Sequence, residues 1–95
     1  MNGELFSISE YCIVHQIDPA FIASLEHEGL ITVVLSNDQQ FIEEEHLQDL
    51  EVFTRWHHDL GINMEGIDAL NNMLLKMRQM QEEMAELKLR LRQYM

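Results

Sequence analysis

Alternating three- and four-residue steps between apolar side chains, from residue 70 onward, constrain the fold of this chain more than any other feature. This is the spacing of the inner face of a coiled coil. A single helix that exposed such a stripe to water would be unstable or adhesive, so the stripe needs a partner. The same helix of a second copy is the simplest partner, and folding back onto the rest of the chain is the alternative. The predicted dimerisation residues are Leu70, Met73, Met77, Met80, Met84, Leu87, Leu91 and Tyr94.

Two short helices with a tight turn between them are predicted before residue 30. Ser7 followed by Glu10 has the capping-box pattern and starts a helix that ends near Gln16. Asp18-Pro19 starts the second helix, which runs to about Glu28 before Gly29 stops it. The expected inward-facing residues are Ile8, Tyr11, Cys12 and Val14 in the first helix and Phe21, Ile22 and Leu25 in the second.

A small hairpin and a third helix are predicted next. Leu30 to Leu35 is a β-branched run, Ser36-Asn37-Asp38 has turn chemistry, and Gln40 to Ile42 returns as a second strand. A helix then extends from Glu43 to about Leu60 and turns Leu47, Leu50, Phe53, Thr54 and Leu60 toward the core. Asn63 is the expected cap of the final helix.

The net charge of −11 is concentrated in the first part of the chain. Residues 1–60 contain twelve acidic residues and a single base, Arg55, whereas residues 61–95 contain five acids and five bases. Such an acidic region repels phosphate backbones and attracts basic protein surfaces. The alternative is that the charge only keeps a small protein in solution.

Neither enzymatic chemistry nor a metal site is expected. Cys12 and His15 have a plausible ligand spacing, and His57-His58-Asp59 is a second cluster, but no further Cys/His pair has zinc-site spacing. Four glycines form no phosphate-binding loop, and we predict no cofactor. Without a long apolar run, a signal-peptide pattern at the N-terminus or a second cysteine, the expected compartment is the cytoplasm and no membrane association is expected.

The order of the predicted elements resembles that of MerR-type regulators. Phe6 to Glu10 is similar to the opening of their first helix, Leu25 to Ile31 to their Glu-Gly-Leu stretch, and Leu60 to Ile67 to their Leu-Gly-Phe-Ser-Leu-Glu-Glu-Ile segment. The resemblance implies a mainly α fold: a MerR-like winged helix-turn-helix head with a small β-hairpin wing in residues 1–62, and a C-terminal coiled-coil dimerisation helix in residues 63–95. A dimeric transcription regulator that binds DNA is therefore one expected function.

The departures from MerR-type DNA readers favour a different function. Those proteins carry arginines on the second helix, on the wing and early in the third helix, but no Lys or Arg precedes Arg55 here. The acidic head, the length and the short coiled coil resemble the CbpM family of chaperone modulators instead. That resemblance implies binding to the J domain of CbpA, a DnaJ-like co-chaperone, inhibition of its co-chaperone activity and suppression of its DNA binding. Because a DNA-binding protein needs several cations to neutralise phosphates, the lack of Lys and Arg predicts no direct nucleic-acid binding by this chain.

The third helix is the predicted partner-binding surface. Its acids would face the basic helix with which a J domain contacts Hsp70, and apolar neighbours would act as anchors. The alternative surface is the second helix, with Asp18, Phe21, Glu26 and Glu28. For Trp56, the alternative to a role in binding is a position in the core. The predicted partner-binding residues are Glu43, Glu44, Glu45, Asp49, Glu51, Val52, Arg55 and Trp56.

Overall fold

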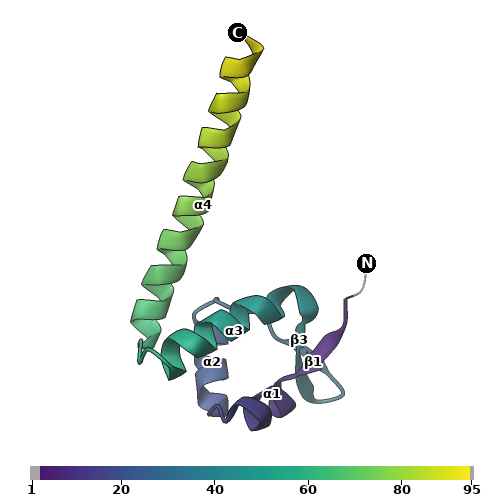
Figure 1. The fold of residues 1–95 in the computed structure, drawn as a ribbon. Helices are drawn as coiled ribbons and strands as arrows, with labels where there is room; N and C mark the ends of the chain where they lie inside the picture. The colour runs from purple at the N-terminus through teal and green to yellow at the C-terminus, as the bar shows by residue number, and fades with distance from the viewer. Residues whose placement is uncertain (1–2, 95) are drawn as a thin grey trace.

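A computed structural model describes residues 3–94 as a small helical head from which one long helix projects (Figure 1). The molecule measures 57 × 34 × 21 Å, and a helix of 30 residues spans about 45 Å, so this helix accounts for most of the length. In chain order the elements are β1 (Leu5–Ser7), α1 (Ile8–His15), α2 (Pro19–His27), β2 (Val34–Ser36), β3 (Gln39–Glu43), α3 (Glu44–His58) and α4 (Met64–Gln93).

Side-chain caps start three of the helices where the sequence predicts them. Ser7 accepts a hydrogen bond from the Glu10 backbone N–H at 3.2 Å, and Asp18 accepts one from Ala20 at 2.9 Å. The Asn63 side chain accepts a hydrogen bond from the Gly66 backbone N–H at 2.8 Å and caps the start of α4. Each cap satisfies one of the backbone donors that the first turn of a helix leaves free.

The sheet has three antiparallel strands in the order β1-β3-β2, so the prediction of a hairpin alone was incomplete. A two-residue turn, Asn37 and Asp38, both with positive φ, joins β2 to β3 as the turn chemistry predicts. β1 pairs with the other edge of β3, with Phe6 opposite Ile42. Three residues are too few to show an alternating pattern, which is why β1 was not predicted.

The first wing strand begins at Val34, four residues later than the predicted Leu30. Gly29, with φ of +75°, ends α2, and the Leu30 N–H donates to the Leu25 carbonyl at 2.9 Å in a Schellman arrangement. Ile31 then enters the core. The β-branched run therefore first caps a helix and fills the core, and only its end forms a strand.

One apolar core joins the head to the base of α4. Its fully buried members are Leu25, Ile42, Leu50 and Ile67, which come from α2, β3, α3 and α4. Two residues predicted to face inward are exposed instead, and those predictions were wrong. Val14 lies about 200° around α1 from Cys12, and Leu60 lies in the turn after α3, where it is 66% exposed.

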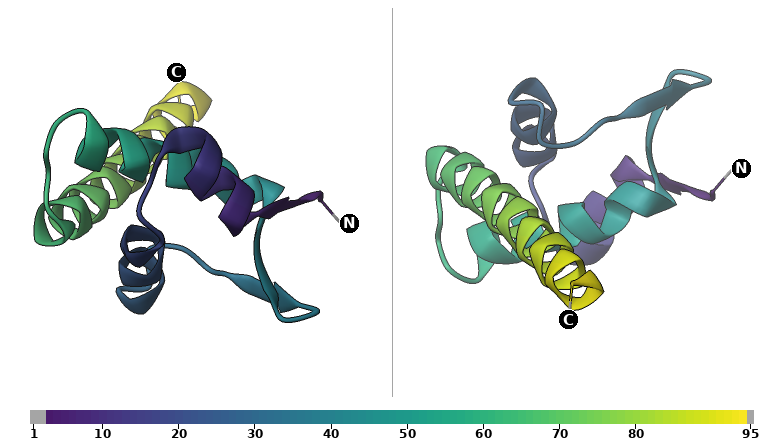
Figure 2. Two further views of the ribbon diagram at one scale, coloured as in Figure 1. Left: turned by 90° about the horizontal axis from the view of Figure 1, so that it is seen from below. Right: turned by 90° about the horizontal axis from the view of Figure 1, so that it is seen from above.

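Beyond its first turns, α4 leaves the head. It starts beside the end of α3 and extends away from the other elements (Figure 1), and in the views from below and above it runs behind and in front of the head (Figure 2). Ile67 is the buried residue of α4, and residues 79–94 are exposed throughout. Residues 79–94 therefore gain no stability from packing within one copy.

Candidate functional site

The residues predicted to bind a partner are divided by the structure between two sides of α3. Residues three, four and seven apart share a side of a helix. Val52 and Trp56 are half-buried, and the charged members from Glu44 onward are exposed. One side carries Glu44, Glu51 and Arg55, the other carries Glu45, Asp49, Val52 and Trp56, and Glu43 precedes both as the last residue of β3.

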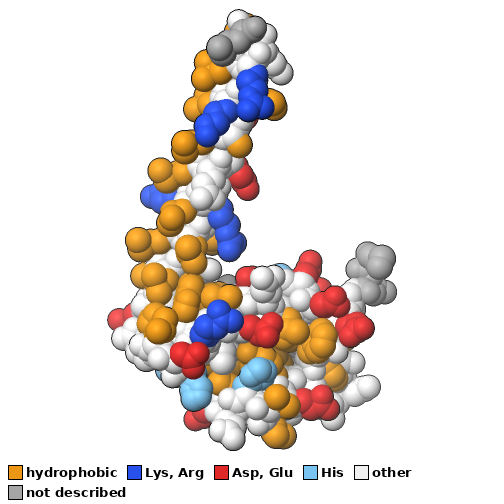
Figure 3. Space-filling model, in the orientation of Figure 1, with side chains coloured by type: hydrophobic (Ala, Val, Ile, Leu, Met, Phe, Trp, Pro, Cys, Tyr) orange, Lys and Arg blue, Asp and Glu red, His pale blue; other side chains and the backbone are white. Residues whose placement is uncertain are grey.

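An acidic hollow lies at the start of α3. Glu43, Glu44 and Glu45 line it together with Gly3 and Gln48, and its volume is about 380 Å³. The three predicted carboxylates are thus brought to one place. Asp and Glu side chains are spread over the head, whereas Lys and Arg side chains lie along α4 and at its base (Figure 3).

A second hollow, which we call the α1–α3 groove, lies between β1, α1 and α3. Its volume is about 210 Å³, and Ser7 and His15 complete its walls. The apolar lining comes from Phe6, Tyr11, Val14 and Leu47, with Glu10 on α1 and Glu51 on α3 as its carboxylates. Glu51 is the one predicted acid that lines the α1–α3 groove.

A third hollow, the head–tail groove, separates the other side of α3 from α4. Asp49, Val52 and Trp56 line it together with Leu75 and Arg78 of α4, and its volume is about 290 Å³. Trp56 also packs against the core, with its ring centroid 5.9 Å from that of Phe53. The predicted anchors Val52 and Trp56 consequently face α4 and lie apart from Glu51.

The predicted dimerisation residues form an exposed stripe along α4. Met73, Met77, Met80, Met84, Leu87, Leu91 and Tyr94 are all more than half exposed. Leu70, nearest the head, is partly buried. Side chains of this size are normally covered, so the stripe is an apolar surface that needs a partner in water.

The sequence matches the model of the MerR HTH regulatory protein family over residues 6–89. The chain belongs to this family. The match extends from β1 into the last turns of α4, so both the head and the projecting helix are parts of the MerR-like fold. No curated protein and no solved structure matches the chain.

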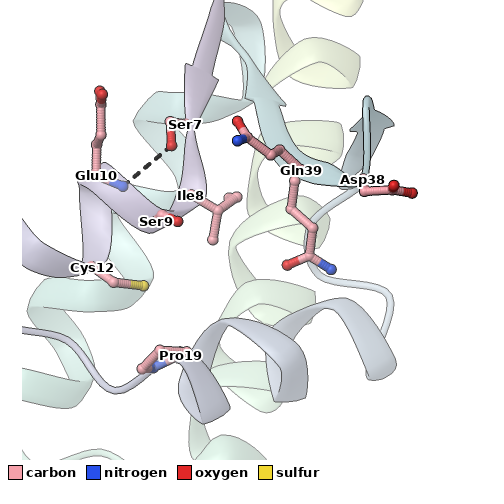
Figure 4. Close-up of a pocket in the computed structure, with 9 residues that line it drawn as sticks. Ser7, Ile8, Ser9, Glu10, Cys12, Pro19, Asp38 and Gln39 are labelled. Atoms are coloured by element: carbon pink, nitrogen blue, oxygen red, sulfur yellow. Dashed lines mark hydrogen bonds between the residues drawn. The ribbon is translucent and has the colours of Figure 1, made fainter.

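The cleft beside the wing of this MerR-like head carries no basic side chain among its lining residues. It lies between the starts of α1 and α2 and the β2–β3 turn, with a volume of about 490 Å³ (Figure 4). Its charged residues are Glu10 and Asp38, and its polar lining includes Gln39. Such a cleft offers phosphate oxygens no charge partner.

The single cysteine and His57 both make contacts within the head. Cys12 is buried in α1, as predicted, and burial raises the pKa of its thiol. His57 stacks on Phe21 with ring centroids 4.4 Å apart, and its Nδ1 lies 2.9 Å from the Ile62 carbonyl oxygen.

Within residues 3–94, no three His, Cys, Asp or Glu side chains are grouped to hold a metal ion. None of the helices in that range is long and apolar enough to cross a bilayer.

A buried hydrogen bond fixes α1 on α3. The Thr54 hydroxyl donates to the Leu50 carbonyl at 2.8 Å, so at the 2.9 Å contact between the two hydroxyls Tyr11 is the donor. Burial raises the Tyr11 pKa above its ordinary value of 10.0. The nearby Glu51 carboxylate also raises this pKa.

We expect the folded protein to lose stability above about pH 10 through Tyr11. A group whose pKa is higher in the folded than in the unfolded state contributes stability at pH values below its unfolded pKa. That contribution is lost as the pH rises through the folded pKa. Because Tyr94 is the only other tyrosine, a Tyr94→Phe background lets absorbance follow Tyr11 alone. Urea unfolding between about pH 8 and 11 measures the effect. The same pH dependence in Tyr11→Phe would contradict it.

The sequence did not predict the lining of the α1–α3 groove. Val14 was placed in the core, and the cross-element contacts of Phe6 and Leu47 have no local signal. One signal was available: Val14 lies two residues, or about 200°, from Cys12, so it cannot share the buried face on which Ile8 and Cys12 lie.

Proposed function

We propose that this chain is a protein–protein modulator that binds the J domain of a DnaJ-like co-chaperone, CbpA, and inhibits its co-chaperone activity. The observation that carries the proposal is the charge of the head: twelve acids and one base in residues 1–60 of a MerR-like fold. Inhibition follows if the acidic surface covers the basic helix through which a J domain contacts Hsp70. Suppression of CbpA's own DNA binding belongs to the same proposal.

Acidic charge and apolar grooves have separate roles in this mechanism. The carboxylates around the start of α3 attract a basic surface over distances of about a Debye length and speed the encounter. Affinity comes mainly from apolar side chains that are desolvated in the complex. Carboxylates and apolar side chains both occur along α3, so this helix supports the proposal.

The head works as one half of a homodimer in this proposal. The exposed stripe of α4 is the surface on which two copies pair, and each dimer then presents two acidic heads. The chain has no metal or cofactor in the proposed function.

A DNA-binding transcription regulator is the second candidate, because the family is one of regulatory proteins. Duplex binding requires several cations that neutralise phosphates. In this head the second helix, the wing and the first two turns of α3 contain neither Lys nor Arg. The charge of the fold therefore favours a protein partner.

Binding to the isolated J domain of CbpA tests the first candidate. We expect a Kd of micromolar or tighter, which weakens about tenfold between about 50 and 300 mM NaCl because the surfaces are oppositely charged. The J domain's stimulation of Hsp70 ATP hydrolysis is expected to fall to the basal rate as the modulator is added. Absence of J-domain binding, together with duplex DNA binding that falls steeply with salt, would favour the regulator instead.

A further inference from the structure

The α1–α3 groove has the size and lining of a binding site for one or two side chains of a partner protein. At about 210 Å³ it is smaller than the roughly 300–1,000 Å³ of sites that enclose small molecules. Its lining is mostly apolar, and Val14, on its lip, is 74% exposed. An exposed valine beside partly buried Phe6 and Leu47 is the arrangement in which an apolar anchor gains most from docking.

Tyr11 contributes its ring to the groove and keeps its hydroxyl inside the head. The Tyr11 hydroxyl is directed to Thr54, and Thr54 in turn donates to Leu50, so both polar groups are satisfied inside the head. The Tyr11 ring remains as lining. A side chain that covers the Tyr11 ring therefore leaves the Tyr11 and Thr54 hydroxyls paired, which removes one cost of binding.

Carboxylates flank this apolar surface from two elements. Glu10 lines the groove from α1 and Glu51 from α3. Glu51 lies on the same side of α3 as Glu44, which lines the acidic hollow, so carboxylates of the groove and of the hollow lie on one side of this helix. Arg55 lies one turn beyond Glu51 and lines neither of them. The complementary guest is a helix with an apolar ridge and Lys or Arg residues on both sides of it.

We infer that the α1–α3 groove receives the apolar ridge of the basic J-domain helix, with Glu10 and Glu51 beside its flanking cations. This inference rests on the proposed function and names the anchor site within it. It moves the apolar anchors from Val52 and Trp56, which face α4, to Val14 and Leu47 on the opposite side of α3. The head–tail groove then has no part in binding the J domain.

Adjacent residues of α1 provide a matched test. Val14 and Ile13 are 74% and 76% exposed, but Val14 lines the groove and Ile13 does not. We expect Val14→Lys to weaken binding of the isolated CbpA J domain by at least about 30-fold, because it removes an anchor and adds a repelling charge. Ile13→Lys makes the same charge change outside the groove and is expected to remain within about threefold of the parent. Circular dichroism confirms that both variants are folded.

A second measurement uses the unaltered protein and complements the two Lys variants. On addition of the J domain, the methyl signals of Val14 and Leu47 in the unaltered protein are expected to shift more than those of Ile13 and Val52. Equal binding by Val14→Lys and Ile13→Lys, or unshifted Val14 and Leu47 methyls in a bound complex, would overturn the groove while leaving J-domain binding intact. Failure of the unaltered protein to bind the J domain would overturn both proposals.

Discussion

Replacing Glu43, Glu44 and Glu45 together by Lys is expected to weaken binding to the isolated J domain of CbpA by about 30-fold or more at low salt. The three carboxylates line one hollow, so their reversal changes the local charge by six units where we propose that a basic helix approaches. Most of the loss should occur in the association rate, because exposed charges act over distance more than in contact. Kinetic binding measurements at two salt concentrations provide the test, since raising the salt should reduce the difference.

A control with the same change in net charge separates the local from the global effect. Glu26, Glu28 and Asp38 are exposed acids of α2, its C-terminal end and the wing turn, and their reversal also adds six units. We expect this triple variant to bind within about threefold of the parent at moderate salt. If it loses as much affinity as the first triple variant, the alternative surface on α2 or the total charge controls binding, and α3 does not.

The helix dipole requires a second control. Glu44 and Glu45 lie in the first turn of α3, where carboxylates stabilise a helix by about 0.3–1 kcal/mol each. Lysines at these positions destabilise the same turn. Replacing the three residues by Gln removes the charge without reversing it, and we expect an intermediate loss of affinity. A thermal unfolding curve for each variant shows whether the head remains folded.

Features determined by neighbouring residues were predictable from the sequence. The N-caps Ser7, Asp18 and Asn63, the wing turn and α4 depend on residues within a few positions of each other, and the structure confirms them. The order of the predicted elements resembled that of MerR-type regulators, and the family match supports this resemblance. The pairing of β1 with β3 and the entry of Ile31 into the core were missed, because both depend on residues distant in sequence.

The candidate site was predictable in its charge but not in its shape. The acids of α3 were identified from the sequence because a run of carboxylates is visible without knowledge of packing. Helical spacing separates Glu51 from Val52 by about 100°, so these two residues belong to different grooves. The groove that contains Glu51 is completed by Phe6 and Val14, whose approach to α3 is a property of the tertiary fold alone.

Introducing Glu at both Met80 and Met84 is expected to convert a dimer into monomers, with the dimer dissociation constant raised by at least about 100-fold, or about 3 kcal/mol. Both methionines lie in the middle of the exposed stripe, so two copies would bring four carboxylates into one apolar seam. Analytical ultracentrifugation measures the change. The variant with Gln79→Glu and Ala85→Glu adds the same charge outside the stripe and should remain dimeric.

The residues of the stripe are spaced symmetrically about Glu82. Two copies of α4 can therefore pair in antiparallel orientation with Glu82 at the centre. In that pairing Leu70 faces Tyr94 of the second copy, Met73 faces Leu91, Met77 faces Leu87 and Met80 faces Met84. A parallel pair also aligns all eight residues, each with its own copy, but it places two acidic heads at the same end. Charge repulsion between the heads therefore favours the antiparallel pair, which also brings the basic end of α4, with Lys88, Arg90 and Arg92, toward the partner's acidic head.

Cysteine cross-linking decides the orientation in a background in which Cys12 is replaced by Ala. For an antiparallel dimer, we expect a mixture of Leu70→Cys and Tyr94→Cys chains to form a disulfide between the two variants, because these positions meet. Each variant alone should cross-link poorly, since its cysteines lie at opposite ends of a helix pair about 35 Å long. Efficient cross-linking of Leu70→Cys with itself would establish the parallel pair and show that the seam, rather than repulsion between the heads, controls how two copies associate.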